Sequence, residues 1–202
     1  MKLYFSPASP FVRKCLVVAH ELNLSDRIEL LPSQAHPVSV DAQIAQSNPL
    51  GQVPTFFTDD GQALYDSRVI CEYLDSLGEG TIFPKASRQR WQALTDQSLA
   101  DGILDAALLA RYESVVRPEH YRWPDWADSQ MNKITRSLAL FETTISERGG
   151  NVDIGTITLA CALGYLDFRF PEFDWRAINP GLAAWFNAFG NRQSMAATMP
   201  HV

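Results

Sequence analysis

Residues 48–57 read Asn-Pro-Leu-Gly-Gln-Val-Pro-Thr-Phe-Phe, and residues 63–74 read Ala-Leu-Tyr-Asp-Ser-Arg-Val-Ile-Cys-Glu-Tyr-Leu. Asp-Asp-Gly at 59–61 separates two short apolar runs, which is the pattern of a β-hairpin. Pro54 stands where the first strand begins, a position at which proline removes only one donor from the sheet. The backbone of Val53 is therefore expected to pair with something other than a neighbouring strand.

Asp66 and Ser67 precede an apolar run and predict the N-terminus of a helix over 67–77. Unsatisfied amides and the positive end of the helix dipole favour an anion at such a place. The bond before Pro54 is one where a cis peptide costs little. An extended, anionic, peptide-like ligand would suit this combination of strand edge and helix start.

The residues before this stretch predict a βαβ unit. A strand is expected at 3–5, and Ser9 followed by Pro10 predicts a helix start, with Pro10 at the first helical position. A second strand is expected at 27–31, which favours a parallel pair with a right-handed crossover. With a short helix near 41–46 and strands at 55–58 and 63–65, the predicted order is β-α-β-(α)-β-β-α.

Beyond residue 77 the chain carries only helical signals. Gly and Pro at 78–84 mark a linker, and long helices are expected from about 87, over 125–148 and over 154–168. The helix over 154–168 is apolar all round and should be buried, with Asp153 and Thr156 as a variant capping box. A further helix should start at Asn179-Pro180. The predicted domains are 1–77, a linker at 78–86 and an all-helical domain at 87–202.

Composition excludes several classes of function. The 202 residues carry a formal net charge of −6 and 46% hydrophobic residues, which argues against nucleic acid as a default partner. Neither a secretion signal nor a run of transmembrane length is visible, so a cytoplasmic protein without a membrane partner is expected. The four histidines are scattered and predict no metal site. Cys15, Cys71 and Cys161 form no CxxC motif and are predicted to be buried packing residues in a reducing compartment.

Ser9 is the candidate for chemistry. A hydroxyl at a helix N-terminus can donate a hydrogen bond to a thiolate, and stabilising the thiolate lowers the pKa of a thiol. The alternative is that Ser9 only caps the helix. Ser6 is a weaker candidate for the same role.

Four motifs together resemble the cytosolic glutathione S-transferase family, and the resemblance covers the whole chain. They are Ser9-Pro10-Phe11-Val12-Arg13-Lys14, the 48–54 run, the 66–74 run and the buried helix from Ile157 to Arg169. The resemblance implies an N-terminal thioredoxin-like domain, a C-terminal helical-bundle domain and a homodimer. It also implies glutathione as co-substrate, without a metal, and a small apolar electrophile as second substrate.

The resemblance also implies a role for individual residues. Val53, before a cis Pro54, would pair its backbone with the cysteinyl part of glutathione, while Gln52 would lie at a carboxylate that many members contact through lysine. Asp66 and Ser67 would bind the γ-glutamyl end, and Ser9 would hydrogen-bond the sulfur. Asp101 would reach the γ-glutamyl amine in a partner subunit. The electrophile pocket would lie between the domains, with Phe11 and Tyr112 as lining residues.

Three readings of function follow from the resemblance. The leading one is a glutathione transferase that activates the thiol as a thiolate. A non-catalytic glutathione-binding or regulatory protein could use the same scaffold. A glutathione-dependent isomerase can use serine, whereas a reductase would need a cysteine where this chain has Ser9.

Overall fold

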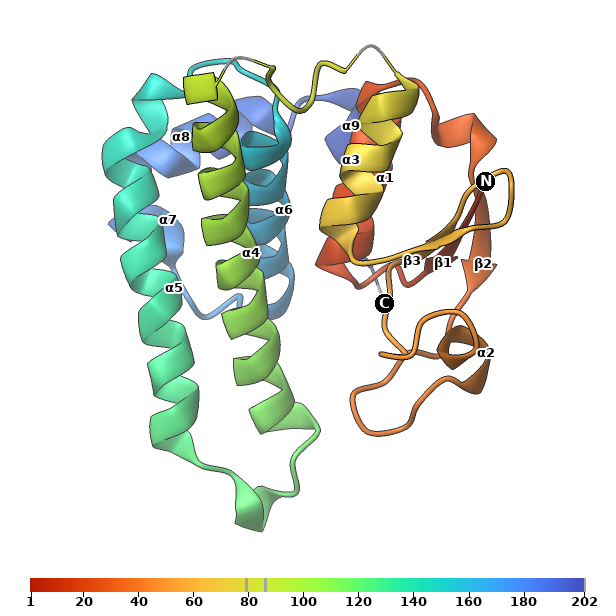
Figure 1. Ribbon diagram of the computed structural model, residues 1–202. Coiled ribbons are helices and arrows are strands. Elements are labelled where there is room, and N and C mark those ends of the chain that lie inside the picture. The colour runs from red at the N-terminus through yellow and green to blue at the C-terminus, as the bar shows by residue number, and fades with distance from the viewer. Residues whose placement is uncertain (79, 86, 202) are drawn as a thin grey trace. The chain divides into compact units, whose positions relative to one another are not determined.

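A computed structural model describes residues 1–78, 80–85 and 87–201. The chain forms two compact units, one of Met1–Ser87 with the residues from Arg192 onward, the other of Arg88–Asn191 (Figure 1). The first holds the sheet and the second is helical, so the fold class predicted from the sequence is confirmed. Residues 79 and 86 of the predicted linker lie outside the described residues, and the C-terminal segment falls in the first unit.

The first unit is built on a four-stranded sheet with the order β2-β1-β3-β4. Its strands are β1 (Lys2–Phe5), β2 (Glu29–Pro32), β3 (Thr55–Phe57) and β4 (Ala63–Leu64). β1 and β2 are parallel, as the βαβ pattern predicts, and the other pairs are antiparallel. The predicted strand at 27–31 starts two residues late, because Ser25–Arg27 form a 3-10 helix.

Three helices accompany these strands: α1 (Pro10–Glu21) connects β1 to β2, α2 (Ala42–Ala45) connects β2 to β3, and α3 (Ser67–Leu77) follows β4. α1 and α3 lie side by side (Figure 1). Their apolar faces join fully buried Leu3 and Phe56 of the sheet in one core. The thiols of Cys15 and Cys71 lie within it, 3.9 Å apart, so both are buried as predicted.

A short helix from the end of the chain, α9 (Gln193–Ala197), packs against α1. The sequence did not predict α9. The guanidinium of Arg13 on α1 donates from Nη2 to the carbonyl oxygen of Met195 at 3.1 Å and from Nε to Thr198 Oγ1 at 3.4 Å. These bonds tie the C-terminal segment to the first helix.

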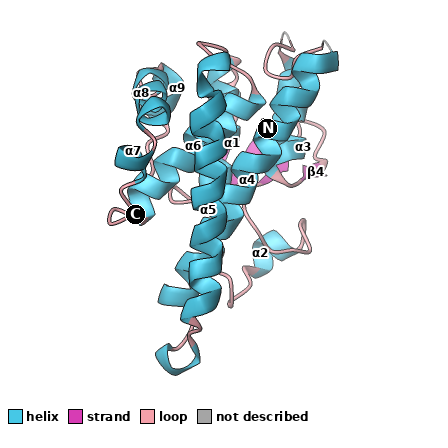
Figure 2. Cartoon of the chain, turned by 90° about the vertical axis from the view of Figure 1, so that its left-hand side faces the viewer, coloured by secondary structure: helices cyan, strands magenta, loops and turns pink. Residues whose placement is uncertain are grey.

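The second unit consists of helices in its described part, as the cyan ribbons of Figure 2 show. They are α4 (Ser87–Val115), α5 (Pro124–Thr144), α6 (Ile154–Arg169), α7 (Trp175–Ile178) and α8 (Pro180–Phe189), with 3-10 turns at Glu119–Tyr121 and Ile145–Glu147. Every residue from 154 to 166 is buried, so the apolar sequence of α6 makes it the core of this unit.

Capping residues set two of the helix starts in this unit. Asp153 accepts from the amide of Thr156 at 3.0 Å and Thr156 Oγ1 accepts from the amide of Asp153 at 2.9 Å, which confirms the capping box. Asn179 begins α8 as predicted, but its side chain donates to the carbonyl oxygen of Trp175 instead of capping. The carboxylate of Glu142 accepts from the first free amides of α8 instead, at 2.9 and 2.7 Å.

Candidate functional site

Ser9 ends the turn between β1 and α1. Its Oγ accepts a hydrogen bond from the amide of Val12 at 3.3 Å, so the capping role is confirmed. Its own amide donates to the carbonyl oxygen of Ser6 at 3.0 Å, which closes the turn. Across residues 1–78, 80–85 and 87–201, the Ser9 hydroxyl donates no hydrogen bond. The hydroxyl hydrogen is thus available to an acceptor such as a thiolate.

The loop before β3 holds Val53 at the edge of the sheet. The Val53–Pro54 peptide is cis, as the family resemblance implies, and so is the Tyr65–Asp66 peptide. The side-chain amide of Asn48 donates to Gln52 O at 3.2 Å and to Thr55 Oγ1 at 2.9 Å. In the described part of the chain the backbone of Val53 makes no hydrogen bond, which leaves its amide and carbonyl for a ligand.

Asp66 and Ser67 open α3. Asp66 Oδ1 accepts from the amide of Arg68 at 2.9 Å, so the predicted N-cap is confirmed. Ser67 is 2% exposed, and its carbonyl oxygen lies 3.9 Å from Cys15 Sγ on α1. Asp66 is exposed and able to meet a cationic group.

These three places converge at one end of the first unit. Thr55 at the start of β3 pairs with Tyr4 near the end of β1, so the loop before β3 lies beside the turn that follows β1. Contacts of Cys15 with Ser67, and of Leu22 with Gly78, show that α1 and α3 run in the same direction. The N-termini of both helices therefore face the same end as Val53.

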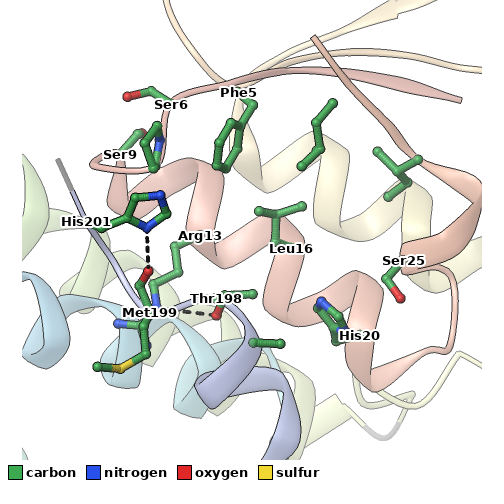
Figure 3. Close-up of a pocket in the computed structure, with 14 residues that line it drawn as sticks. Phe5, Ser6, Ser9, Arg13, Leu16, His20, Ser25, Thr198, Met199 and His201 are labelled. Atoms are coloured by element: carbon green, nitrogen blue, oxygen red, sulfur yellow. Dashed lines mark hydrogen bonds between the residues drawn. The ribbon is translucent and has the colours of Figure 1, made fainter. Parts of the chain in front are cut away.

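A cavity of about 170 Å³ adjoins Ser9 (Figure 3). Its walls are the end of β1, one side of α1, β2 with the residues before it, and the C-terminal segment. Figure 3 shows Ser9 and His201 at one end and His20 and Ser25 at the other. The lining residues are Phe5, Ser6, Pro7, Ser9, Arg13, Leu16, His20, Ser25, Ile28, Leu30, Ala197, Thr198, Met199 and His201. This C-terminal wall was not predicted from the sequence.

The remaining predicted residues divide between the two units. Gln52 is exposed in the loop before β3, and half-buried Phe11 lies on α1 with the Lys14 ammonium 5.8 Å from its ring. Asp101 and Tyr112 belong to α4 in the second unit. Asp101 is 1% exposed, and burial raises the pKa of the half-buried Tyr112 phenol.

Two other kinds of site find no support in the described residues. Among residues 1–78, 80–85 and 87–201, histidine, cysteine, aspartate and glutamate side chains nowhere gather in a group of three able to hold a metal ion. Within the same ranges, every helix is too short or too polar to cross a membrane.

Comparison with known proteins gives family matches over both units. Residues 8–77 match the model of the glutathione S-transferase N-terminal domain, and residues 124–188 match that of the C-terminal domain. The uncharacterised GST-like protein YibF of Escherichia coli K12 is 34% identical over 205 residues, which cover 99% of this chain and 98% of YibF.

Solved structures of a glutathione transferase family member from Pseudomonas fluorescens Pf-5 are also similar. One with bound glutathione has 47% identity and a TM-score of 0.97, covering 100% of this chain and 99% of that one. Another, with bound S-(propanoic acid)-glutathione, has 46% identity and a TM-score of 0.92, covering 100% of both chains.

Proposed function

This chain belongs to the glutathione S-transferase family, and on that premise we propose that it transfers glutathione to a small electrophile after activating the thiol as a thiolate. One observation carries the proposal. Among the described residues, the Ser9 hydroxyl donates no hydrogen bond and the Val53 backbone makes none, and both lie with the N-terminus of α3 at one end of the first unit.

Each of these groups meets a different part of glutathione in the proposal. The backbone of Val53 pairs with the cysteinyl residue, as an added strand would pair with a sheet edge. Asp66 and Ser67 hold the γ-glutamyl end, where Asp66 faces the amino group and the amides of α3 face the carboxylate. Gln52 donates from its side-chain amide to a carboxylate of glutathione.

The proposed chemistry rests on Ser9. When its hydroxyl donates to the sulfur, the thiolate is stabilised and the pKa of the thiol falls. The thiolate then attacks the electrophile, a carbon–sulfur bond forms and the leaving group departs with its electron pair. The rate gain comes from stabilising the thiolate and from holding the two reactants together.

The second substrate and the quaternary structure complete the proposal. Phe11 on α1 and Tyr112 on α4 contribute apolar surface for the electrophile. Asp101 contributes to the glutathione site of a partner subunit in a homodimer. The S-(propanoic acid)-glutathione bound to the Pseudomonas fluorescens protein supports a site that tolerates an acidic substituent on the sulfur.

Two measurements test this function together. Calorimetry with glutathione should show binding at millimolar or lower concentration, and a screen of alkyl and aryl halides, epoxides and activated alkenes should show glutathione-dependent turnover. Binding without any turnover would instead favour a regulatory protein. Isomerised products without conjugates would instead favour an isomerase, and the absence of binding would overturn the proposal.

A further inference from the structure

Two arginines of the second unit lie on neighbouring helices at the same level. The carbonyl oxygen of Ala93 and Cβ of Asp96 lie 2.8 and 2.7 Å from where a Cβ on Gly155 would stand, so α4 and α6 touch there. Both helices run in the same direction (Figure 1). Arg169 follows Gly155 by 14 residues and Arg111 follows Asp96 by 15 residues, so the distances along the two helices differ by only one residue. Arg111 and Arg169 are therefore level with each other.

Aromatic side chains lie near these arginines. Tyr112 follows Arg111 on α4. On α6, Tyr165 precedes Arg169 by one helical turn, so Tyr165 and Arg169 lie on one face of that helix. The guanidinium carbon of Arg169 lies 3.9 Å from the centre of the Phe168 ring. Tyr165 is buried. The surroundings thus include the ring of Phe168 and the phenol of Tyr165, which is hydrogen-bonded to the Arg169 side chain.

No acidic group of the described residues compensates these charges. Ion pairs among the described residues of the second unit include those of Arg117 with Glu113, Arg148 with Asp96 and Glu147, and Arg176 with Asp167. Within residues 1–78, 80–85 and 87–201, neither Arg111 nor Arg169 has a carboxylate within ion-pair distance. Nε of Arg169 is buried and has no hydrogen-bond partner there. A buried donor left without a partner calls for an acceptor from elsewhere.

The pKa shifts of Arg169 and Tyr165 also favour an anion at this place. The pKa of Arg169 is lowered, first by burial of the guanidinium and then by the like charge of Arg111. Burial raises the pKa of Tyr165 to about 12, against the opposing effect of the nearby Arg111 cation. Its phenol therefore stays neutral at pH 7 and cannot balance the arginines, although its O–H can still donate.

We propose that Arg111 and Arg169 bind the carboxylate of the second substrate, with the O–H of Tyr165 as an additional donor. The inference rests on the proposed function and names its substrate class, a small aromatic electrophile that carries a carboxylate. A guanidinium presents donors in a planar fork that matches a carboxylate. The rings of Tyr112 and Phe168 supply contacts for the apolar body of such a substrate.

A matched pair of electrophiles tests this assignment. In 4-(chloromethyl)benzoate the thiolate sulfur forms a bond to the benzylic carbon while the carbon–chlorine bond breaks and chloride leaves with the electron pair. The thiol proton passes to solvent when the thiolate forms. The uncharged 4-(chloromethyl)benzamide undergoes the same reaction and has nearly the same shape, so comparing the two isolates the carboxylate.

The quantity measured is the ratio of kcat/KM for the acid to kcat/KM for the amide. We expect the ratio to exceed one in the wild type and to fall about tenfold in Arg111→Gln and in Arg169→Gln, because one charge-assisted hydrogen bond is lost. Arg136→Gln removes the same charge from an exposed position on α5 and should leave the ratio unchanged. A ratio that neither Arg111→Gln nor Arg169→Gln changes would overturn the assignment.

A binding experiment separates failure of this inference from failure of the proposed function. Benzoate is titrated against benzamide by calorimetry, without glutathione, at two salt concentrations. The wild type should bind benzoate more tightly than benzamide. Both the Arg111→Gln substitution and a higher salt concentration should weaken the binding of benzoate. If neither electrophile turns over but benzoate binding depends on Arg111, the transferase proposal fails and the carboxylate site stands. Equal affinity for benzoate and benzamide overturns the site.

Discussion

The guanidinium of Arg192 binds both carboxylate oxygens of Glu21, with Nε–Oε1 at 2.8 Å and Nη2–Oε2 at 2.7 Å. The hydroxyl of Ser194 donates to the same carboxylate. The side chains of Glu21 and Arg192 are 13% and 37% exposed. This pair fastens the C-terminal segment to the end of α1, and the same segment forms a wall of the cavity beside Ser9. The end of the chain therefore shapes the surroundings of Ser9, the proposed hydrogen-bond donor to the thiolate.

Replacing Arg192 by Gln should destabilise the first unit. Two charge-assisted hydrogen bonds to a shielded carboxylate are lost, so we expect a decrease of about 1.5–3 kcal/mol in the free energy of unfolding. Urea denaturation measures it. Arg27→Gln is the matched control, because its ion pair with Asp59 is 52% and 62% exposed and should contribute less than about 1 kcal/mol. Equal losses in both variants would contradict the assigned role of Arg192.

The contribution of Glu21 should also depend on pH. The hydrogen bond from Arg192 is the largest cause that holds the pKa of Glu21 below its ordinary value of 4.5, against the opposing effect of burial. A carboxylate with a lowered pKa in the folded state stabilises the protein above the unfolded value. That stability is lost as the pH falls through the folded value. The difference in unfolding free energy between wild type and Glu21→Gln should be constant above about pH 5 and shrink below pH 4.5. A difference that grows on acidification would contradict this sign.

Local signals predicted most of the fold. Ser9-Pro10 and Asp153 with Thr156 mark helix starts through bonds within one turn, and Asp-Asp-Gly marks a hairpin. These patterns act over a few residues, so a sequence displays them directly. α7 and α9 were missed because helices of four and five residues have too few turns for a periodic pattern and depend on packing for their stability.

In the candidate site, too, the residues marked by local sequence were predicted and those brought together by packing were not. Ser9, Val53 and Asp66 were predicted from their own neighbours in the sequence. The contact of Glu21 with Arg192 joins residues 171 positions apart. Arg111 lies level with Arg169 only because α4 and α6 are adjacent. Nothing local marks either pairing, since an arginine on a helix is most often solvated. Such partners become visible only when the packing of the helices is known.

Ser9→Ala should separate catalysis from binding. The substitution removes the donor to the sulfur, so we expect the thiol pKa of bound glutathione to rise and turnover to fall by at least tenfold. Glutathione affinity should change little, because Val53, Asp66 and Ser67 remain. The pH dependence of thiolate absorbance in the complex measures the thiol pKa, and calorimetry measures the glutathione affinity.

Two further variants control for the capping role of Ser9. Loss of the bond to the Val12 amide should cost about 1 kcal/mol in Ser9→Ala, whereas Ser9→Thr keeps a hydroxyl and should retain much of the stability and turnover. Ser6→Ala removes the neighbouring hydroxyl and should leave the thiol pKa of bound glutathione unchanged. If Ser6→Ala raises the thiol pKa and Ser9→Ala does not, the role belongs to Ser6.

Gly155 allows α6 to approach α4 closely, and substitutions at two glycines should test this contact. A Cβ at Gly155 would lie 2.7 Å from Asp96 Cβ and 2.8 Å from the carbonyl oxygen of Ala93, so the two helices must separate to admit it. We expect Gly155→Ala to lower the free energy of unfolding by about 1–3 kcal/mol. Gly102 on α4 is helical and exposed, and a Cβ there meets no atom within 4 Å.

The same substitution at these two positions should therefore have opposite signs. Alanine forms helices better than glycine, so Gly102→Ala should stabilise the protein by about 0.5–1 kcal/mol. Denaturant unfolding of both variants measures the pair. Because Arg111 and Arg169 depend on the same helix contact, Gly155→Ala should also weaken benzoate binding, whereas Gly102→Ala should not. Stabilisation by alanine at both positions would show that α4 and α6 are farther apart than the structure places them.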